Sequence, residues 1–291
     1  MNDVILQDNL VFVAVNWGGL AIFNISDPSS PVLIGTYQES YETLYASDLT
    51  NGVFVEDDIA FVAAGKKGLL ILNISNPYHP VKIAQHNEND ICYQLVYANQ
   101  LVYAKFGYNR LIVLNVTNLK SPVKIHEETF NALQELSIQN NLLFIITPLL
   151  FYPCRSYIIN VSNPLTFDIL HVLNTTVTFS LNQDFFCMLD DSNRFIVYDI
   201  DAFPSLVVLV NYSLPLHETA HYLCANNAYA YISSLDELLQ VEITTPSDPE
   251  ARATIEGLNW QYASAPYSVD RRFATPAAPT KESMVVFVDY Q

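Results

Sequence analysis

The segment with the clearest chemical potential is His217-Glu218-Thr219-Ala220-His221, which has the HExxH spacing of zinc metalloproteases. That spacing binds one zinc ion when it is helical, because positions i and i+4 then share a helix face. Pro215 precedes the segment, and the repeat pattern described below predicts extended chain here. In extended chain the two histidines stand roughly 13 Å apart, at about 3.3 Å per residue. We therefore expect a polar loop, and we retain His217 and His221 as the candidates for a metal site.

Several Asn-x-Ser/Thr triplets are formal N-glycosylation acceptors. In four of them an apolar strand ends at the asparagine, so we expect its amide to hydrogen-bond the backbone of the following turn; these are Asn24, Asn73, Asn115 and Asn160. Asn174 and Asn211 lie between the repeat units and are the glycosylation candidates if the chain is secreted.

The run Asp190 to Asn193 resembles a calcium loop only in its oxygen ligands, because the glycine and distal glutamate of an EF-hand are missing.

Composition and charge exclude several classes of protein. Acidic residues outnumber basic ones 30 to 13, for a formal charge of −17, so we expect neither nucleic acid nor an anionic membrane surface as a partner. No stretch reaches the ~18 apolar residues of a membrane span, and residues 1–6 read as a strand rather than a leader. The four cysteines, without a CxxC pair, predict neither a zinc cluster nor a disulfide framework. No cofactor motif is present, and we predict no cofactor.

The elements that would position these residues recur along the whole chain. A polar turn, an apolar strand, a loop and a second strand ending in Asn, Asp or Glu occur seven times. The strand-end residues are Asn24, Asn73, Asn115, Asn160, Asp199, Glu242 and Asp289. Their spacings are 49, 42, 45, 39, 43 and 47 residues. A period of about 40–45 residues with four strand-sized segments is typical of a β-propeller blade.

We therefore predict one all-β domain over residues 1–291, a seven-bladed β-propeller of four-stranded antiparallel blades. The approximate blades are 1–40, 41–86, 87–128, 129–172, 173–214, 215–256 and 257–291. The second strand of blade 1, Leu10 to Ala14, is apolar at every position, as expected when blades cover both faces of a strand. The pattern stops at the third strand of blade 7, so we predict that the last blade lacks its outer strand. Because an open edge invites aggregation, we expect the natural chain to continue.

Three strings, LAIFNISDPSSPVLIGTY, LLILNISNPYHPVKIAQ and LIVLNVTNLKSPVKIHE, carry a resemblance to a known family. They resemble the LVIVD repeat, well in blades 1 to 3, partly in blades 4 to 6 and faintly in blade 7. Asn replaces the family's Asp at four strand ends. The resemblance implies a β-propeller of a surface protein, and it supplies no catalytic residues.

A ligand is expected on the face that carries the loops between second and third strands and the loops between blades, because binding residues gather on variable loops of rigid scaffolds. We call this the loop face. Its predicted binding residues are aromatic or cationic, the types that anchor interfaces: Trp17, Tyr41, Lys66, Lys67, Tyr108, Arg110, Phe151, Tyr152, Arg155, Arg194 and Trp260.

The function predicted from these features is non-enzymatic binding of a protein or glycan by part of a larger surface or secreted protein. Two alternatives stay open. One is an enzyme, metal-assisted or not, with its active site at the mouth of the central channel. The other is an intracellular, cytoplasmic interaction propeller. The sequence does not indicate the oligomeric state.

Overall fold

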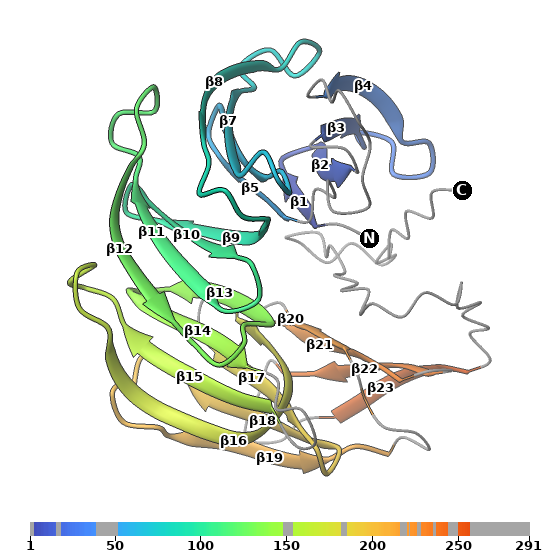
Figure 1. Cartoon of the computed structure of the whole chain (residues 1–291). Coiled ribbons are helices and arrows are strands. Elements are labelled where there is room, and N and C mark those ends of the chain that lie inside the picture. Colours follow the sequence, from blue (N-terminus) through green and yellow to red (C-terminus); the bar gives the residue numbers. More distant parts are fainter. Residues whose placement is uncertain are drawn as a thin grey trace.

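The computed structural model describes residues 3–15, 19–38, 52–147, 154–181, 185–215, 220, 222–225, 228–234, 237–243 and 250–256. Within these ranges every element is a β-strand. The strands form four-stranded antiparallel blades that fan around a common centre, with the first strand of each blade inside and the fourth outside (Figure 1). The predicted propeller is confirmed as a fold class. Six blades lie in the described ranges, and the predicted seventh, 257–291, lies outside them.

The strands follow one another blade by blade. Blade 1 contains β1 (Val4–Gln7), β2 (Leu10–Val15), β3 (Gly19–Asn24) and β4 (Val32–Tyr37); blade 2 contains β5 (Gly52–Glu56), β6 (Ile59–Ala63), β7 (Leu69–Asn73) and β8 (Val81–His86); blade 3 contains β9 (Cys92–Ala98), β10 (Leu101–Phe106), β11 (Arg110–Asn115) and β12 (Val123–Thr129). Blade 4 contains β13 (Glu135–Gln139), β14 (Leu142–Thr147), β15 (Cys154–Asn160) and the start of β16 (Asp168–Leu181); blade 5 contains the end of β16, β17 (Phe185–Asp190), β18 (Arg194–Asp199) and β19 (Val208–Ser213); blade 6 contains β20 (Tyr222–Ala225), β21 (Tyr229–Ser233), β22 (Glu237–Glu242) and β23 (Glu250–Glu256).

Blades 4 and 5 are joined by one continuous strand. β16 pairs with β15 up to Thr176 and with β17 from Thr176 onward. It is therefore the outer strand of blade 4 and the inner strand of blade 5, and the boundary expected at residues 172 and 173 falls inside it.

The polar pairs between first and second strands make tight hairpins. The first residue of the pair has a positive φ in the turns at Asp8 (54°) and Asp57 (50°), and both residues do in the turn at Asn140 and Asn141 (49° and 61°). Asn and Asp tolerate this left-handed region better than most residues. These turns therefore fix where each second strand begins, and they set the register of the blade.

A β-bulge recurs at the same place in all six described blades. The pairing of the third strand with the fourth shifts register between the two residues that precede the strand-end Asn, Asp or Glu. In blade 1 the shift falls between Ile22 and Phe23, and in blade 2 it falls between Ile71 and Leu72. The outer-strand residue opposite this point meets the next blade's turn: a Cβ on Gly35 would stand 1.9 Å from the carbonyl oxygen of Pro77. In the same way the His126 ring lies 4.6 Å from the Phe167 ring. The turns of blades 2 and 4 thus rest on the blades before them.

The inner strands are tied together by side chains that reach across the blade junctions. The Leu136 N–H donates to Gln94 Oε1 (3.0 Å), and Gln94 Nε2 donates to the Leu136 carbonyl (3.3 Å). The Ala225 N–H donates to Ser180 Oγ (2.9 Å) in a corresponding contact between blades 5 and 6. These bonds partner backbone groups at the inner sheet edges, which would otherwise be buried without a partner.

The core lies between the blades rather than inside one. Five apolar clusters each combine two consecutive blades, from blades 1 and 2 to blades 5 and 6. Cys92 and Cys187 are buried among them, and Cys224 is half-buried. Burial raises the pKa of the Cys92 and Cys187 thiols, so these sulfurs stay protonated and unreactive.

Candidate functional site

Of the eleven predicted binding residues, six lie in the part of the chain that the structure describes: Lys66, Lys67, Tyr108, Arg110, Arg155 and Arg194. The other five lie outside the described residues: Trp17, Tyr41, Phe151, Tyr152 and Trp260. The metal candidates His217 and His221 also lie outside them. The predicted binding face can therefore be built from its part on blades 2 to 5.

The loop carrying Lys66 and Lys67 is held by its backbone. Asn87 Nδ2 donates to the Lys66 carbonyl (2.7 Å), and Gln85 Nε2 donates to the Lys67 carbonyl (2.8 Å). Gly68 has a φ of +79°, and a Cβ there would stand 2.2 Å from the His86 carbonyl oxygen, so only glycine fits this close approach. The loop is thus fixed against β8 and the segment that leads to blade 3.

Next to this loop, blade 3 presents an aromatic surface. Tyr108 is 74% exposed, the highest value for any large apolar side chain in the described ranges. Its ring lies 6.1 Å from the Tyr93 ring, and Lys105 Nζ lies 5.4 Å from the centre of the Tyr93 ring. The Cys92 N–H donates to the Gly65 carbonyl (2.9 Å), which joins this surface to the lysine loop. We call Lys66, Lys67, Tyr93, Lys105 and Tyr108 the tyrosine–lysine patch.

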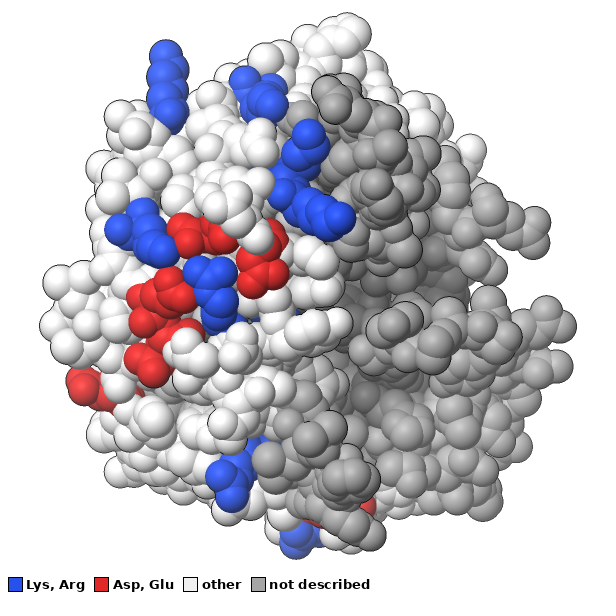
Figure 2. All heavy atoms as spheres, in the orientation of Figure 1, with Lys and Arg blue, Asp and Glu red and all other residues white. Residues whose placement is uncertain are grey.

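Arg110 is held in a network of ion pairs beside the patch. Its guanidinium contacts Glu127 Oε1 (2.7 Å), Glu88 Oε2 (3.3 Å) and Asp90 Oδ2 (3.4 Å). Lys124 Nζ contacts Glu88 (2.8 Å) and Glu127 (3.1 Å). Figure 2 shows acidic and basic side chains intermingled on this side of the molecule rather than a surface of one sign. The network clamps the segment between blades 2 and 3 onto the outer strand β12.

Two carboxylates of this network, Glu88 and Glu127, are stabilised in their charged form. Hydrogen bonds from Arg110, together with those from Lys124, lower the pKa of Glu127 from 4.5 to about 2. Burial alone would raise the pKa of Glu88, but hydrogen bonds from Lys124 and His86 outweigh it, and that pKa is lowered. Glu88 and Glu127 are therefore held in their charged form by the cations that they contact.

The predicted basic residues on blades 4 and 5 lie apart from the patch. Asp190 is buried, and its Oδ1 accepts the N–H groups of Ser192 and Arg194 (both 2.9 Å) while Oδ2 accepts Arg194 Nε (2.7 Å). These contacts close the loop between β17 and β18 around the Asp190 carboxylate. Arg155 is exposed at the start of β15, and its carbonyl accepts the Thr147 hydroxyl (3.3 Å).

The sequon asparagines divide into the two predicted groups. The Oδ1 atoms of Asn24, Asn73, Asn115 and Asn160 accept the N–H two residues ahead, at 2.8 to 2.9 Å. Asp199 makes the same contact in blade 5, to the Asp201 N–H (2.9 Å). The residue is needed as an acceptor, so Asn and Asp serve equally. Asn174 and Asn211 are both exposed, and their glycosylation stays a prediction.

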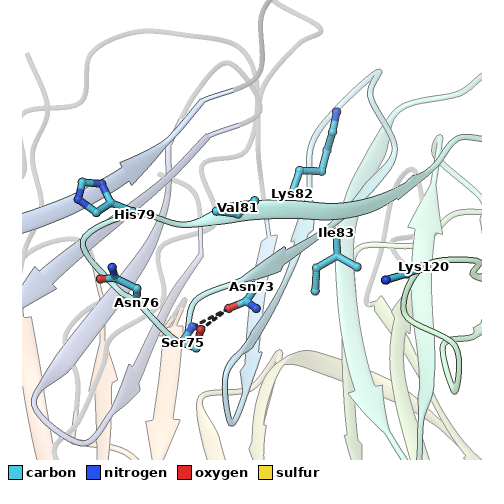
Figure 3. A pocket seen from close by; sticks show the side chains of 8 residues that line it. All are labelled: Asn73, Ser75, Asn76, His79, Val81, Lys82, Ile83 and Lys120. Carbon is cyan, nitrogen blue, oxygen red and sulfur yellow. Dashed lines mark hydrogen bonds between the residues drawn. The ribbon is translucent and has the colours of Figure 1, made fainter.

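On the opposite face, which carries the hairpins and the turns between third and fourth strands, the structure has a groove that the sequence reading missed. We call this face the turn face. The groove spans about 540 Å³ between the turns of blades 2 and 3 (Figure 3). It is lined by Asn73, Ser75, Asn76, His79, Val81, Lys82, Ile83 and Lys120. The repeated Asn-x-Ser turn could have pointed to it, but the spacing of adjacent turns follows only from packing of the blades.

The described ranges were also searched for metal-binding clusters and for membrane-spanning helices. No group of three or more His, Cys, Asp or Glu residues that could hold a metal ion occurs there. The same ranges contain no helix long and apolar enough to cross a membrane.

Two of the repeats match a known protein family. The LVIVD repeat family matches residues 1–39 and 49–87. Blades 1 and 2 thus match the LVIVD repeat. The match confirms the resemblance for the first two of the three strings, which lie within these residues; the third string, in blade 3, lies outside them. A search of curated proteins found no significant sequence match.

Solved structures share the fold at low identity. A hypothetical selenium-binding protein from Sulfolobus tokodaii aligns with a TM-score of 0.66 and 11% identity, over 88% of this chain and 77% of that one. The periplasmic gluconolactonase PpgL of Pseudomonas aeruginosa aligns with a TM-score of 0.61 and 12% identity, over 86% and 83%. The β-propeller domain of Myceliophteria thermophila Cps50 (Swd1) aligns with a TM-score of 0.55 and 10% identity, over 78% and 76%. At such identities these similarities establish the β-propeller and nothing about activity.

Proposed function

We propose that this LVIVD-repeat propeller is a non-enzymatic binding or scaffold module, part of a surface or secreted protein, that binds a protein or glycan through its loop face. The observation that carries the proposal is Tyr108, whose ring is 74% exposed on that face. The other strongly exposed large apolar side chains of the described ranges lie on the outer strands and the turn face: Val32, Leu33, Tyr78, Val81, Val123, Leu165, Ile169, Val172, Val207 and Val208.

The surroundings of Tyr108 fit binding better than chemistry. Exposed tyrosine supplies a large contact area at low entropic cost, either for a protein or for the apolar face of a sugar. Lys105 lies over the neighbouring Tyr93 ring and adds a positive charge, and the ion-paired Arg110 follows Tyr108 two positions along the chain. The resemblance to surface proteins supports the proposed location.

The test compares two tyrosines on opposite faces. Tyr108→Ala and Tyr78→Ala remove similar exposed rings, since Tyr78 is 57% exposed on the turn face. Wild type and both variants are immobilised and probed with a glycan array and with surface-protein extracts of the producing cells. We expect ligands that wild type and Tyr78→Ala retain and that Tyr108→Ala loses at least tenfold. Ligands lost only by Tyr78→Ala, or retained by all three proteins, would overturn the proposal. Thermal melting controls for folding.

A further inference from the structure

The turn-face groove between blades 2 and 3 is lined by lysine and no carboxylate. None of its lining residues is Asp or Glu, although acidic residues outnumber basic ones 30 to 13 in the chain. Lys120 reaches the groove from the turn of blade 3, and its ammonium nitrogen is directed toward Ile83 (Figure 3). Lys82 also lines the groove, and its ammonium group points away from Ile83 (Figure 3). A groove of this composition favours an anionic ligand, even in a protein of negative net charge.

Two asparagine side chains add hydrogen-bond donors to the groove. Asn73 Oδ1 accepts the N–H (2.9 Å) and the hydroxyl (2.6 Å) of Ser75. Asn76 Oδ1 accepts the Tyr78 N–H (3.2 Å). Because the amide oxygens are bound to the turn in this way, each side chain offers its Nδ2 group to a ligand. Together with the Lys120 ammonium group, these donors match the oxygen atoms of a carboxylate.

The preceding junction, between blades 1 and 2, differs at the corresponding positions. Counted from the strand-end asparagine, Asp27 takes the place of Asn76, and Tyr78 takes the place of Lys120. A Cβ on Gly35 would stand 3.2 Å from the Tyr78 Cα, so Tyr78 belongs to that junction, and it does not line the groove. A carboxylate in one position and a phenol in the other make the preceding junction unsuited to an anion.

The following junction, between blades 3 and 4, differs as well. Leu165 takes the place of Lys120 there. Lys124, which corresponds to Lys82, contacts Glu88 (2.8 Å) and Glu127 (3.1 Å). Lys120, in contrast, takes part in none of the ion pairs between described residues. The combination of donors in the groove is therefore particular to blades 2 and 3 and is not a general property of the repeat.

We propose that this groove binds an acidic peptide segment of a partner protein. A carboxylate of the peptide contacts Lys120 Nζ and the Nδ2 groups of Asn73 and Asn76, and a neighbouring aliphatic side chain packs against Val81 and Ile83. No aromatic ring lines the groove, which favours a peptide over a sugar, whose apolar face packs on such rings. The formal charge of −17 disfavours a nucleic acid. The site lies on the turn face and is independent of the binding proposed for the loop face.

The first test measures the binding of synthetic peptides to the full chain. One fluorescein-labelled library alternates Asp and Glu with Ile, Leu and Val, and a matched library has Asn and Gln in place of the acids. We expect acidic peptides to bind wild type at least tenfold more tightly than their amide counterparts. Lys120→Gln removes the ammonium group, and Asn76→Asp adds a carboxylate in a turn that blade 1 forms with Asp27. Each variant is expected to weaken binding at least tenfold.

Two control variants separate the groove from general charge and from the loop face. Lys66→Gln changes the net charge as Lys120→Gln does, and Tyr108→Ala alters the loop face; both are expected to bind the peptides within twofold of wild type. Equal binding of the two libraries, or a loss with Lys66→Gln as large as with Lys120→Gln, would refute the proposal. A sulfated oligosaccharide that binds through Lys120 while no acidic peptide does would refute the choice of a peptide. Thermal melting verifies that every variant is folded.

A second measurement locates the bound peptide on the protein. In isotope-labelled protein the side-chain amide signals of Asn73 and Asn76 are assigned by their loss in Asn73→Asp and Asn76→Asp. An acidic peptide is expected to shift both signals and to leave that of Asn24 in place, because Asn24 has the position of Asn73 in blade 1. A peptide that binds without shifting the Asn73 and Asn76 signals would show that the groove is not its site.

Discussion

The side-chain bonds between inner strands make a prediction that can be quantified at Gln94. This residue is buried, with 6% exposure, and its amide both donates to and accepts from the backbone of Leu136 in the next blade. Gln94→Leu keeps a similar volume but leaves the Leu136 N–H and carbonyl without this partner. A buried group left without a partner costs about 1–3 kcal/mol. Because the second bond is long at 3.3 Å, we expect a total loss of about 3 kcal/mol.

The matched control makes the same substitution at a surface site. Gln85 is exposed, and its amide donates to the Lys67 carbonyl (2.8 Å). Water replaces that bond when the amide is removed, so Gln85→Leu is expected to cost less than about 1 kcal/mol. Guanidinium unfolding followed by far-ultraviolet circular dichroism measures both variants. A Gln94→Leu variant within about 0.5 kcal/mol of wild type, or a Gln85→Leu variant that loses as much, would refute the reasoning.

Three further predictions concern the ion pairs, the bulge and the turns. The pKa of Glu127 is about 2 in the folded chain against an ordinary 4.5, so its ion pairs stabilise the fold above about pH 4.5, and this contribution is lost as the pH falls toward 2. Since the carboxylate is 33% exposed, Glu127→Gln is expected to lower the free energy of unfolding by about 1 kcal/mol at pH 7 and by less at pH 3. Urea titrations measure both values, and equal losses at the two pH values would contradict this prediction. Gly35→Ala is expected to lower the free energy of unfolding by about 1–3 kcal/mol, because its Cβ would stand 1.9 Å from the Pro77 carbonyl oxygen. In the control Gly52→Ala the nearest atom lies at 3.2 Å, so this variant is expected to melt at a temperature closer to that of wild type. The reverse order of melting temperatures would count against the contact at Gly35. Asn73→Ala removes the acceptor for the Ser75 N–H and hydroxyl and is expected to cost about 1 kcal/mol, whereas Asn73→Asp keeps the acceptor and leaves the melting temperature near that of wild type; a large loss with Asp would show that the amide N–H₂ matters as well.

Much of the fold could be read from the sequence because each blade is built from local signals. The polar pairs such as Asn140-Asn141 favour positive φ, and the all-apolar second strands require cover on both faces. The second strand of blade 1, predicted over Leu10 to Ala14, runs over Leu10–Val15 in the structure. The continuous strand β16 was missed, because the chain between blades 4 and 5 carries no Gly or Pro to mark the change of partner.

The candidate site was predictable only in its residue types. Tyr108 and Arg110 were placed on the loop face by their position after a second strand, but nothing in the sequence separates their roles. Arg110 is held by three carboxylates, two of them from the segment between blades, while Tyr108 is left exposed. Contacts of this kind join residues about 20 positions apart, and they depend on how blades 2 and 3 pack rather than on any local pattern.

The most direct test of the binding face captures whatever touches it in the producing cells. A photo-crosslinking benzoyl-phenylalanine replaces Tyr108 in one variant and Tyr78 in the other, and both are irradiated in place before mass spectrometry of the adducts. Our proposal predicts a defined protein or glycan adduct at position 108 and none at position 78. An adduct confined to position 78, or none at position 108 in a correctly folded protein, would contradict the claim that the loop face around Tyr108 is the binding surface.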